Sequence, residues 1–151
     1  MVKVKHRYLL AEVIYQDPLT KNLATDVDIH RAILHSVGML HGDLGHASTQ
    51  SSLQVKVCDF IFSVVVLRVA ADALGYVASA IPFVVNVGNS DAILRVLFQG
   101  SSMRTVEKKL IQFNLKLFYA KLRRRPDSAE SSALRTAIAR VTGSNVSHIK
   151  L

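Results

Sequence analysis

The chain has 151 residues, 50% of them hydrophobic, a formal net charge of +8 at pH 7 and one cysteine. This length predicts about one domain, and the hydrophobic fraction excludes a disordered tail. A single cysteine excludes an internal disulfide and a multi-cysteine zinc site, and it is typical of a reducing compartment. The strong positive charge indicates a polyanionic partner on one surface, and the apolar content indicates a protein partner on another.

The first third of the chain predicts one strand and one helix. Alternating β-branched and aromatic residues place the strand at residues 5–15, before a turn. Apolar residues at helical spacing place the helix at residues 25–40. Thr25 is the expected N-cap of this helix, and Gly42 is the residue expected to end it. Residues 41–46 are expected to form a loop.

Residues 51–122 predict five further elements. These are strands at 51–57, 60–71 and 92–98, and helices at 72–80 and 103–122. Asp72 is the predicted N-cap of the shorter helix. The strand at 60–71 is apolar on both faces, so neither face of the sheet is expected to meet water. Its apolar run is far below the roughly 20 residues of a membrane helix, and no membrane contact is expected.

The order of the elements is β-α-β-β-α-β followed by helices. This order predicts an α+β, ferredoxin-like (RRM-like) fold, in which two helices cover one face of a four-stranded antiparallel sheet. Either the long C-terminal helix or a partner covers the second face. The helix is favoured, because a helix of the same chain loses no association entropy. Residues 1–122 are the expected domain, and residues 123–151 are a basic linker with a short helix and a tail.

The long helix carries most of the positive charge. Eight basic residues and one acid, Glu107, lie between residues 103 and 125. Helical geometry puts five of the basic residues on one face: Arg104, Lys108, Lys109, Lys116 and Arg123. With no acids to pair at i+4, this face repels itself unless an anion binds there. We therefore predict that it binds the phosphates of a nucleic acid.

Two further segments are candidates for the same surface. Gly100, Ser101 and Ser102 precede the free backbone N–H groups of the long helix, which predicts a site for one phosphate. At the chain start, a basic cluster with one aromatic residue stands at the first strand: Lys3, Lys5, His6, Arg7 and Tyr8. Alternation along the strand puts His6 and Tyr8 on one face and Lys5 and Arg7 on the other. Spacing alone leaves open whether this cluster is a charged strand start or a binding site.

Several chemistries are not supported by any motif. No Gly-Lys-Ser/Thr follows the glycine at residue 100, and no two histidines have the spacing of a helical zinc pair. No Ser/His/Asp set or pair of carboxylates has a recognisable context, so neither catalytic nor metal-binding residues are predicted. Phe60 and Phe62 lack the glycine and flanking bases of an RRM motif. Contacts to the phosphates of a structured RNA or DNA are therefore favoured over base stacking.

Three segments together resemble one known family. They are the start Lys5-His6-Arg7-Tyr8-Leu9-Leu10, the stretch 42–47, and the segment from Gly100 to Thr105 with residues 110–114. Their sequence, order and spacing resemble the small protein subunit of ribonuclease P and ribonuclease MRP that is called "processing of precursors five" (Pop five). The resemblance covers about residues 1–122.

This resemblance implies a subunit that is not catalytic by itself and binds no cofactor. It implies a ribonucleoprotein endoribonuclease whose RNA, with bound Mg²⁺, removes the 5′ leader of precursor tRNA. The related MRP particle processes precursor ribosomal RNA. The implied partners are the ribonuclease P RNA, the MRP RNA, a TIM-barrel protein subunit and a second ferredoxin-like subunit, with precursor tRNA met through the particle. The implied location is nucleus and nucleolus. The residues that match the family motifs are Lys5, His6, Arg7, Tyr8, Gly100, Arg104 and Lys108.

Two other functions are compatible with the sequence. A ferredoxin-like adaptor could use the basic helix to bind an acidic protein partner. An autonomous metal-dependent nuclease would need a carboxylate cluster, which the sequence does not offer. Strong salt dependence of binding to a structured RNA separates the RNA-binding subunit from the adaptor.

Overall fold

The computed structural model describes residues 5–17, 24–59 and 63–124. The chain divides into two compact units, residues 1–110 and residues 111–151, and each is described by itself. The elements in chain order are β1 (His6–Tyr15), α1 (Asp26–Gln50), β2 (Gln54–Asp59), β3 (Val64–Ala70), α2 (Leu74–Ala80), the 3-10 helix η2 (Ile81–Phe83), β4 (Asn86–Val87), β5 (Ser90–Gly100) and α3 (Met103–Arg124). The predicted helix after residue 126 lies outside the described residues.

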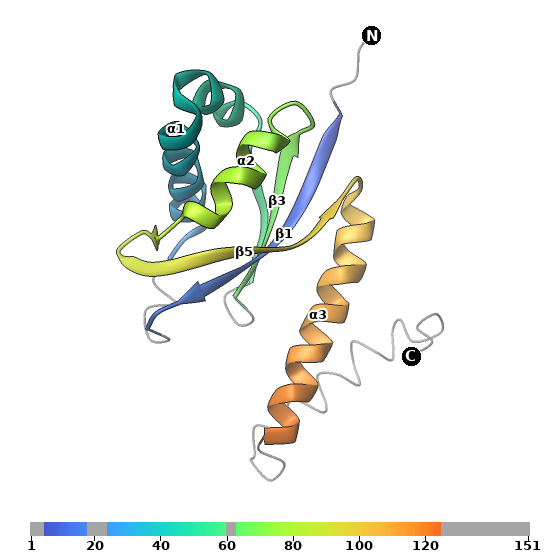
Figure 1. The fold of residues 1–151 in the computed structure, drawn as a ribbon. Helices are drawn as coiled ribbons and strands as arrows, with labels where there is room; N and C mark the ends of the chain where they lie inside the picture. The colour runs from blue at the N-terminus through green and yellow to red at the C-terminus, as the bar shows by residue number, and fades with distance from the viewer. Residues whose placement is uncertain (1–4, 18–23, 60–62, 125–151) are drawn as a thin grey trace. The chain divides into compact units, whose positions relative to one another are not determined.

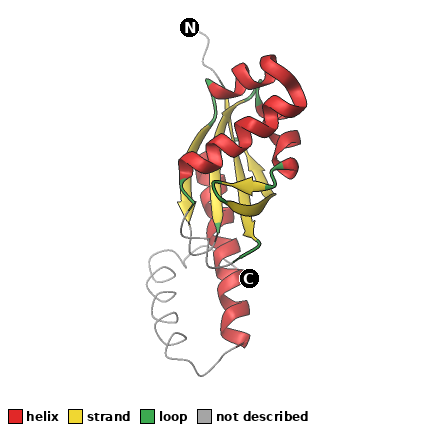
Figure 2. Cartoon of the chain, turned by 90° about the vertical axis from the view of Figure 1, so that its left-hand side faces the viewer, coloured by secondary structure: helices red, strands yellow, loops and turns green. Residues whose placement is uncertain are grey.

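The first unit contains an antiparallel sheet with strand order β2-β3-β1-β5-β4. Helices α1 and α2 lie side by side on one face of this sheet (Figures 1 and 2). The four long strands and the two helices follow the predicted β-α-β-β-α-β order. The α+β, ferredoxin-like fold expected from the sequence is therefore confirmed, with α3 after it.

The sheet has five strands, whereas the sequence predicted four. The additional strand β4 forms a hairpin with β5, in which Val87 pairs with Ser90. Gly88 and Asn89 make the turn, and Gly88 has a φ of +61°, which glycine adopts without strain. A two-residue Gly-Asn turn favours such a hairpin, but two-residue strands carry too little pattern to be predicted.

Helix α1 begins as the sequence predicts and ends later. The Thr25 backbone N–H donates to Asp28 Oδ2 at 2.9 Å, and the Asp28 N–H donates to Thr25 Oγ1 at 3.3 Å, so the two residues form a capping box. Gly42 kinks the helix with φ of +63°. The predicted loop at 41–46 is wrong, because the chain re-enters the helix and continues to Gln50. Gly45 permits this, since a Cβ there would lie 2.5 Å from His41 Cβ.

The start of α2 also differs from the prediction. Asp72 is not the N-cap: Ala73 occupies that position, and no side chain caps the helix. Ala73 already has helical backbone angles, so Asp72 lies one residue too early to reach the first free N–H groups. Asp72 instead borders a recess near the end of α1.

The core lies between the sheet and the two helices. Alternate residues of β3, Val65, Leu67 and Val69, face this core with Ile29 and Ile33 of α1. The other face of β3 carries Val64 and Val66, which are also fully buried. The second face is thus shielded from water at β3, but Ile14 of β1 and Ile93 of β5, which pair on this face, are exposed, so the expectation does not hold for the whole face. Which segment or partner covers it stays a prediction. Within the described residues, no helix is long and apolar enough to span a membrane.

Candidate nucleic-acid interface

The sheet register brings the two predicted binding segments together. Tyr8 on β1 pairs with Gly100 on β5 and, on its other side, with Arg68 on β3. Arg68 in turn pairs with Gln54 on β2. Residues that are directly opposite in antiparallel strands lie on the same face of a sheet. Gly100, Tyr8, Arg68 and Gln54 therefore form one line across four strands, which we call the register row.

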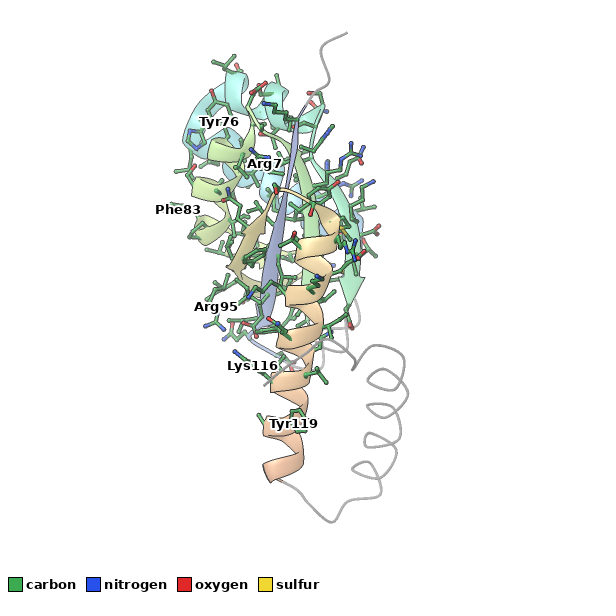
Figure 3. The ribbon with its side chains drawn as sticks, turned by 90° about the vertical axis from the view of Figure 1, so that its right-hand side faces the viewer. Arg7, Tyr76, Phe83, Arg95, Lys116 and Tyr119 are labelled. Atoms are coloured by element: carbon green, nitrogen blue, oxygen red, sulfur yellow. The ribbon has the colours of Figure 1, made fainter. Side chains whose placement is uncertain are left out.

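The N-terminal cluster is divided between the two faces. His6 pairs with Ala70 and lies on the face of the register row, whereas Arg7 pairs with Val69, which faces the core side. The alternation read from the sequence predicted this division. Arg7 is only half-buried, because it lies near the end of β1; Figure 3 shows it toward the opposite end of the sheet from Arg95. Lys5 is exposed immediately before β1, and Lys3 lies outside the described residues.

The start of α3 is held by Ser102. The Thr105 N–H donates to Ser102 Oγ at 3.4 Å, and the two hydroxyl oxygens are 2.9 Å apart. Ser102 therefore satisfies one of the N–H groups that the sequence predicted to be free for a phosphate. Ser101 remains exposed beside it. The predicted anion site at this helix start is correspondingly smaller than the sequence indicated.

The residues of the predicted basic face of α3 differ in their contacts and in the unit to which they belong. Arg104 and Lys108 are exposed and form no salt bridge with a described residue. Lys109 places its Nζ 5.7 Å from the centre of the Phe98 ring, which is a cation–π contact within the first unit. Lys116 is exposed in the second unit (Figure 3). Arg123 belongs to α3, but its side chain lies outside the description.

Sequence reasoning missed Arg68 and Gln54. Arg68 Nη2 lies 3.1 Å from His6 Nε2, and Arg68 Nη1 donates to Gln54 Oε1 at 3.5 Å. The one available signal was a charged residue within a strand that is otherwise apolar on both faces. Its neighbours could not be found locally, because His6 lies 62 residues away in the chain. The guanidinium adds a cation to the face that carries His6 and Tyr8.

Two histidines and the cysteine, which could in principle take part in chemistry, are held by contacts within the fold or by burial. His30 Nε2 lies 3.2 Å from the Leu53 carbonyl, and His41 Nε2 lies 2.7 Å from Ser79 Oγ. Burial raises the pKa of the Cys58 thiol to about 11, with Asp26 and Asp59 adding to the shift. The thiol is therefore protonated at neutral pH and is a poor nucleophile. In the part of the chain that the structure describes, no three potential metal ligands gather.

Comparison with known proteins identifies the family. The model of the Rpp14/Pop5 family matches residues 7–111, which is more than half of the chain. The chain belongs to the Rpp14/Pop5 family. The resemblance seen in the sequence motifs is therefore confirmed. The matched residues of this Rpp14/Pop5 chain include the complete register row and the first two turns of α3, but not Lys116.

Individual relatives agree with this assignment. The chain is 28% identical over 144 residues to the ribonuclease P/MRP protein subunit POP5 of Bos taurus, covering 93% of this chain and 85% of the relative. It is 31% identical to the corresponding subunit of Danio rerio, with coverages of 91% and 85%. A chain in the cryo-EM structure of yeast ribonuclease MRP aligns with a TM-score of 0.53 at 13% identity, covering 77% of this chain and 95% of that chain. This last similarity shows a shared fold.

Gly100 has a packing role at the site, and this role can be tested. A Cβ at residue 100 would lie 2.9 Å from Val106 Cγ2 and 3.1 Å from Phe98 Cε1. Because Val106 is fully buried, the first turns of α3 would have to shift. We expect Gly100→Ala to lower the free energy of unfolding by about 1–3 kcal/mol, the usual cost of overpacking. Urea unfolding followed by circular dichroism measures this loss.

The chain offers a matched control in α2. A Cβ at Gly75 would meet nothing within 4 Å. Gly75→Ala should therefore leave the unfolding free energy unchanged or raise it by up to about 1 kcal/mol, since alanine is the better helix former. Equal effects of the two substitutions would contradict the packing role of Gly100.

Proposed function

We propose that this chain is a non-catalytic, RNA-binding protein subunit of ribonuclease P and of ribonuclease MRP. The observation that carries the proposal is the register row, which joins the Lys5–Tyr8 segment to the Gly100–Arg104 segment on one structural unit. The names of the relatives, ribonuclease P/MRP protein subunits, supply the particle. In this proposal the chain stabilises a catalytic RNA that removes the 5′ leader of precursor tRNA.

The charges around the register row support an RNA ligand. Arg104 and Lys108 are exposed, and no carboxylate of the described residues pairs with them or with Arg68. At the other end of the same face, by contrast, Arg95 is paired with Glu12. Unpaired cations grouped on one surface attract phosphates without reading base identity. The surface is therefore suited to the backbone of a folded RNA.

The proposal assigns the chemistry to the RNA. His30 contacts a backbone carbonyl, His41 contacts a serine hydroxyl, and Cys58 is protonated at neutral pH. In the proposed particle Mg²⁺ is held by the RNA, and this chain binds no cofactor. Its protein neighbours would be a TIM-barrel subunit and a second ferredoxin-like subunit, in the nucleus and nucleolus.

Replacing two of the cations tests the RNA-binding role. Arg104→Ala with Lys108→Ala should weaken binding to ribonuclease P RNA, because two phosphate contacts are lost. The slope of log affinity against log salt should flatten by roughly 0.7–0.9 for each lost contact. The loss should be the same for RNAs of different sequence that share one fold. A salt titration of binding measures both quantities.

A charge-matched variant controls for the change in net charge. Arg31 and Lys56 are exposed, on α1 and β2. Arg31→Ala with Lys56→Ala removes the same charge and should change the slope little. An unchanged slope and affinity in a folded Arg104/Lys108 variant would remove this surface from the RNA interface. The adaptor that binds an acidic protein would then be the better account.

The absence of catalysis by the protein is tested separately. The purified chain with Mg²⁺ should leave precursor tRNA intact, and the particle that contains the RNA should cleave it. Cleavage by the protein alone, retained after repurification free of contaminating ribonuclease, would overturn this part of the proposal.

A further inference from the structure

A recess opens beside Arg68, where β1 and β3 approach the end of α1. Its volume is about 440 Å³, which is larger than a phosphate group requires. Its polar lining residues are His6, Gln54, Arg68, Ser48, Ser51, Ser52 and Asp72. We propose that this recess binds one ribonucleotide unit, with its phosphate at Arg68 and its ribose hydroxyls toward the serines. The assignment to RNA rests on the proposed function, whereas the recess itself can be tested with mononucleotides.

The hydrogen bonds of Arg68 are incomplete. A guanidinium has five N–H donors, and two of those of Arg68 have partners. The 3.5 Å contact to Gln54 is at the limit of a hydrogen bond, and Nε is shielded from solvent with no hydrogen-bond partner among the described residues. An unsatisfied buried donor is costly. A conformer in which the guanidinium turns toward a ligand in the recess would relieve that cost.

The charge of Arg68 is also uncompensated. Neither of its hydrogen-bond partners is a carboxylate: one is the Gln54 amide oxygen and the other is a ring nitrogen of His6. No carboxylate of the described residues forms a salt bridge with Arg68. A phosphate fits this group best, since a guanidinium can donate two parallel N–H···O bonds to it. His6 and Gln54 then act as positioning residues that hold the guanidinium at the edge of the recess.

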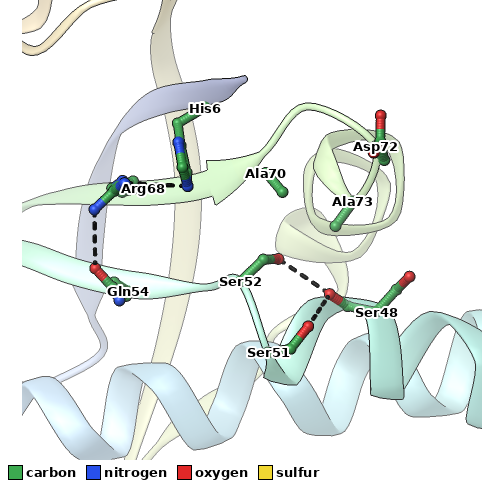
Figure 4. A pocket seen from close by; sticks show the side chains of 9 residues that line it. All are labelled: His6, Ser48, Ser51, Ser52, Gln54, Arg68, Ala70, Asp72 and Ala73. Atoms are coloured by element: carbon green, nitrogen blue, oxygen red, sulfur yellow. Dashed lines mark hydrogen bonds between the residues drawn. The ribbon is translucent and has the colours of Figure 1, made fainter. Parts of the chain in front are cut away.

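The opposite side of the recess offers acceptors. Ser51 Oγ and Ser52 Oγ donate to the Ser48 carbonyl at 3.2 and 3.0 Å, and their own oxygen lone pairs remain available as acceptors. Figure 4 shows Arg68, His6 and Gln54 on one side and the three serines on the other. A second phosphate would be unfavourable beside Asp72. Ribose hydroxyls, in contrast, can donate to serine oxygens and to a carboxylate.

The two sides together define the ligand. A cationic side and an acceptor side match a phosphate joined to a sugar that carries hydroxyl groups. Inorganic phosphate would occupy only the Arg68 side. A deoxyribonucleotide would lose the 2′-hydroxyl donor, so the recess should discriminate between RNA and DNA units. The same chemistry could come from a free ribonucleotide or from a nucleotide within an RNA strand.

Mononucleotide binding to the full chain tests the proposal. Adenosine 5′-monophosphate (AMP) should bind several-fold more tightly than its 2′-deoxy form, as measured by isothermal titration. Arg68→Gln should weaken AMP binding by at least about tenfold, since hydrogen bonds to charged groups contribute strongly. Ser51→Ala with Ser52→Ala should remove the preference for AMP over its deoxy form and leave binding of inorganic phosphate unchanged. Arg31→Gln is the control for charge and should change none of these values.

Several results would overturn the proposal. Equal binding of AMP by the wild type and the Arg68→Gln variant would do so, as would equal binding of AMP and its deoxy form by the wild type. Arg68→Lys keeps the charge and removes the two parallel N–H donors of the guanidinium. It provides a second variant if circular dichroism shows that Arg68→Gln does not fold. It should also weaken AMP binding, and an unaffected affinity would count against the site.

Further measurements distinguish an RNA strand from a free ribonucleotide as the ligand. They also distinguish failure of this proposal from failure of the proposed function. Competition against AMP by a five-nucleotide RNA without terminal phosphates supports a site for an RNA strand, whereas lack of competition supports one for a free nucleotide. Arg104→Ala with Lys108→Ala should leave AMP binding intact, because neither residue borders the recess. If ribonuclease P RNA does not bind but AMP binding depends on Arg68, the proposed function fails and the recess stands. The reverse outcome rejects the recess and retains the proposed function.

Discussion

The antiparallel register of β1 is the constraint on which the proposed interface depends. It places Tyr8 between Gly100 and Arg68, and thereby joins segments that lie more than ninety residues apart in the chain. The pairing of β1 with β5 contains a bulge between Leu10 and Ala11. The bulge lets Leu94 face the core while the end of β5 aligns with the register row. A slip of one residue would turn Tyr8 and Arg68 toward opposite faces.

The start of α3 links this register to the basic residues. Gly100 ends β5 with no side chain, and this allows the buried Val106 to approach the strand. Ser102 caps the helix and so fixes where α3 begins after β5. This sets the positions of the exposed Arg104 and Lys108 in the first two turns of α3. A glycine that resembles part of a binding motif thus has a packing reason of its own. The recess beside Arg68 lies further along the same row and extends the cationic surface to β3.

Local signals in the sequence were sufficient for most of the elements. Thr25 as an N-cap before an apolar stripe at helical spacing predicted the start of α1, and alternation predicted the faces of His6 and Arg7. The continuation of α1 beyond Gly42 was not predictable, because the same glycine can end a helix or kink it, and tertiary packing decides. The roles of Arg68 and Gln54 depend on strand pairing across long separations, which has no local signature.

The central claim is that the β1 start and the α3 start contact one RNA segment. Photo-crosslinking groups placed separately at Tyr8 and Ser101 of the full chain, bound to ribonuclease P RNA, test it most directly. A third group at the exposed Val85, beside β4, serves as the control. The account predicts that the first two positions crosslink to the same or adjacent nucleotides and that Val85 does not. Crosslinks from Tyr8 and Ser101 to unrelated RNA segments, or none from either in a folded complex, would contradict it.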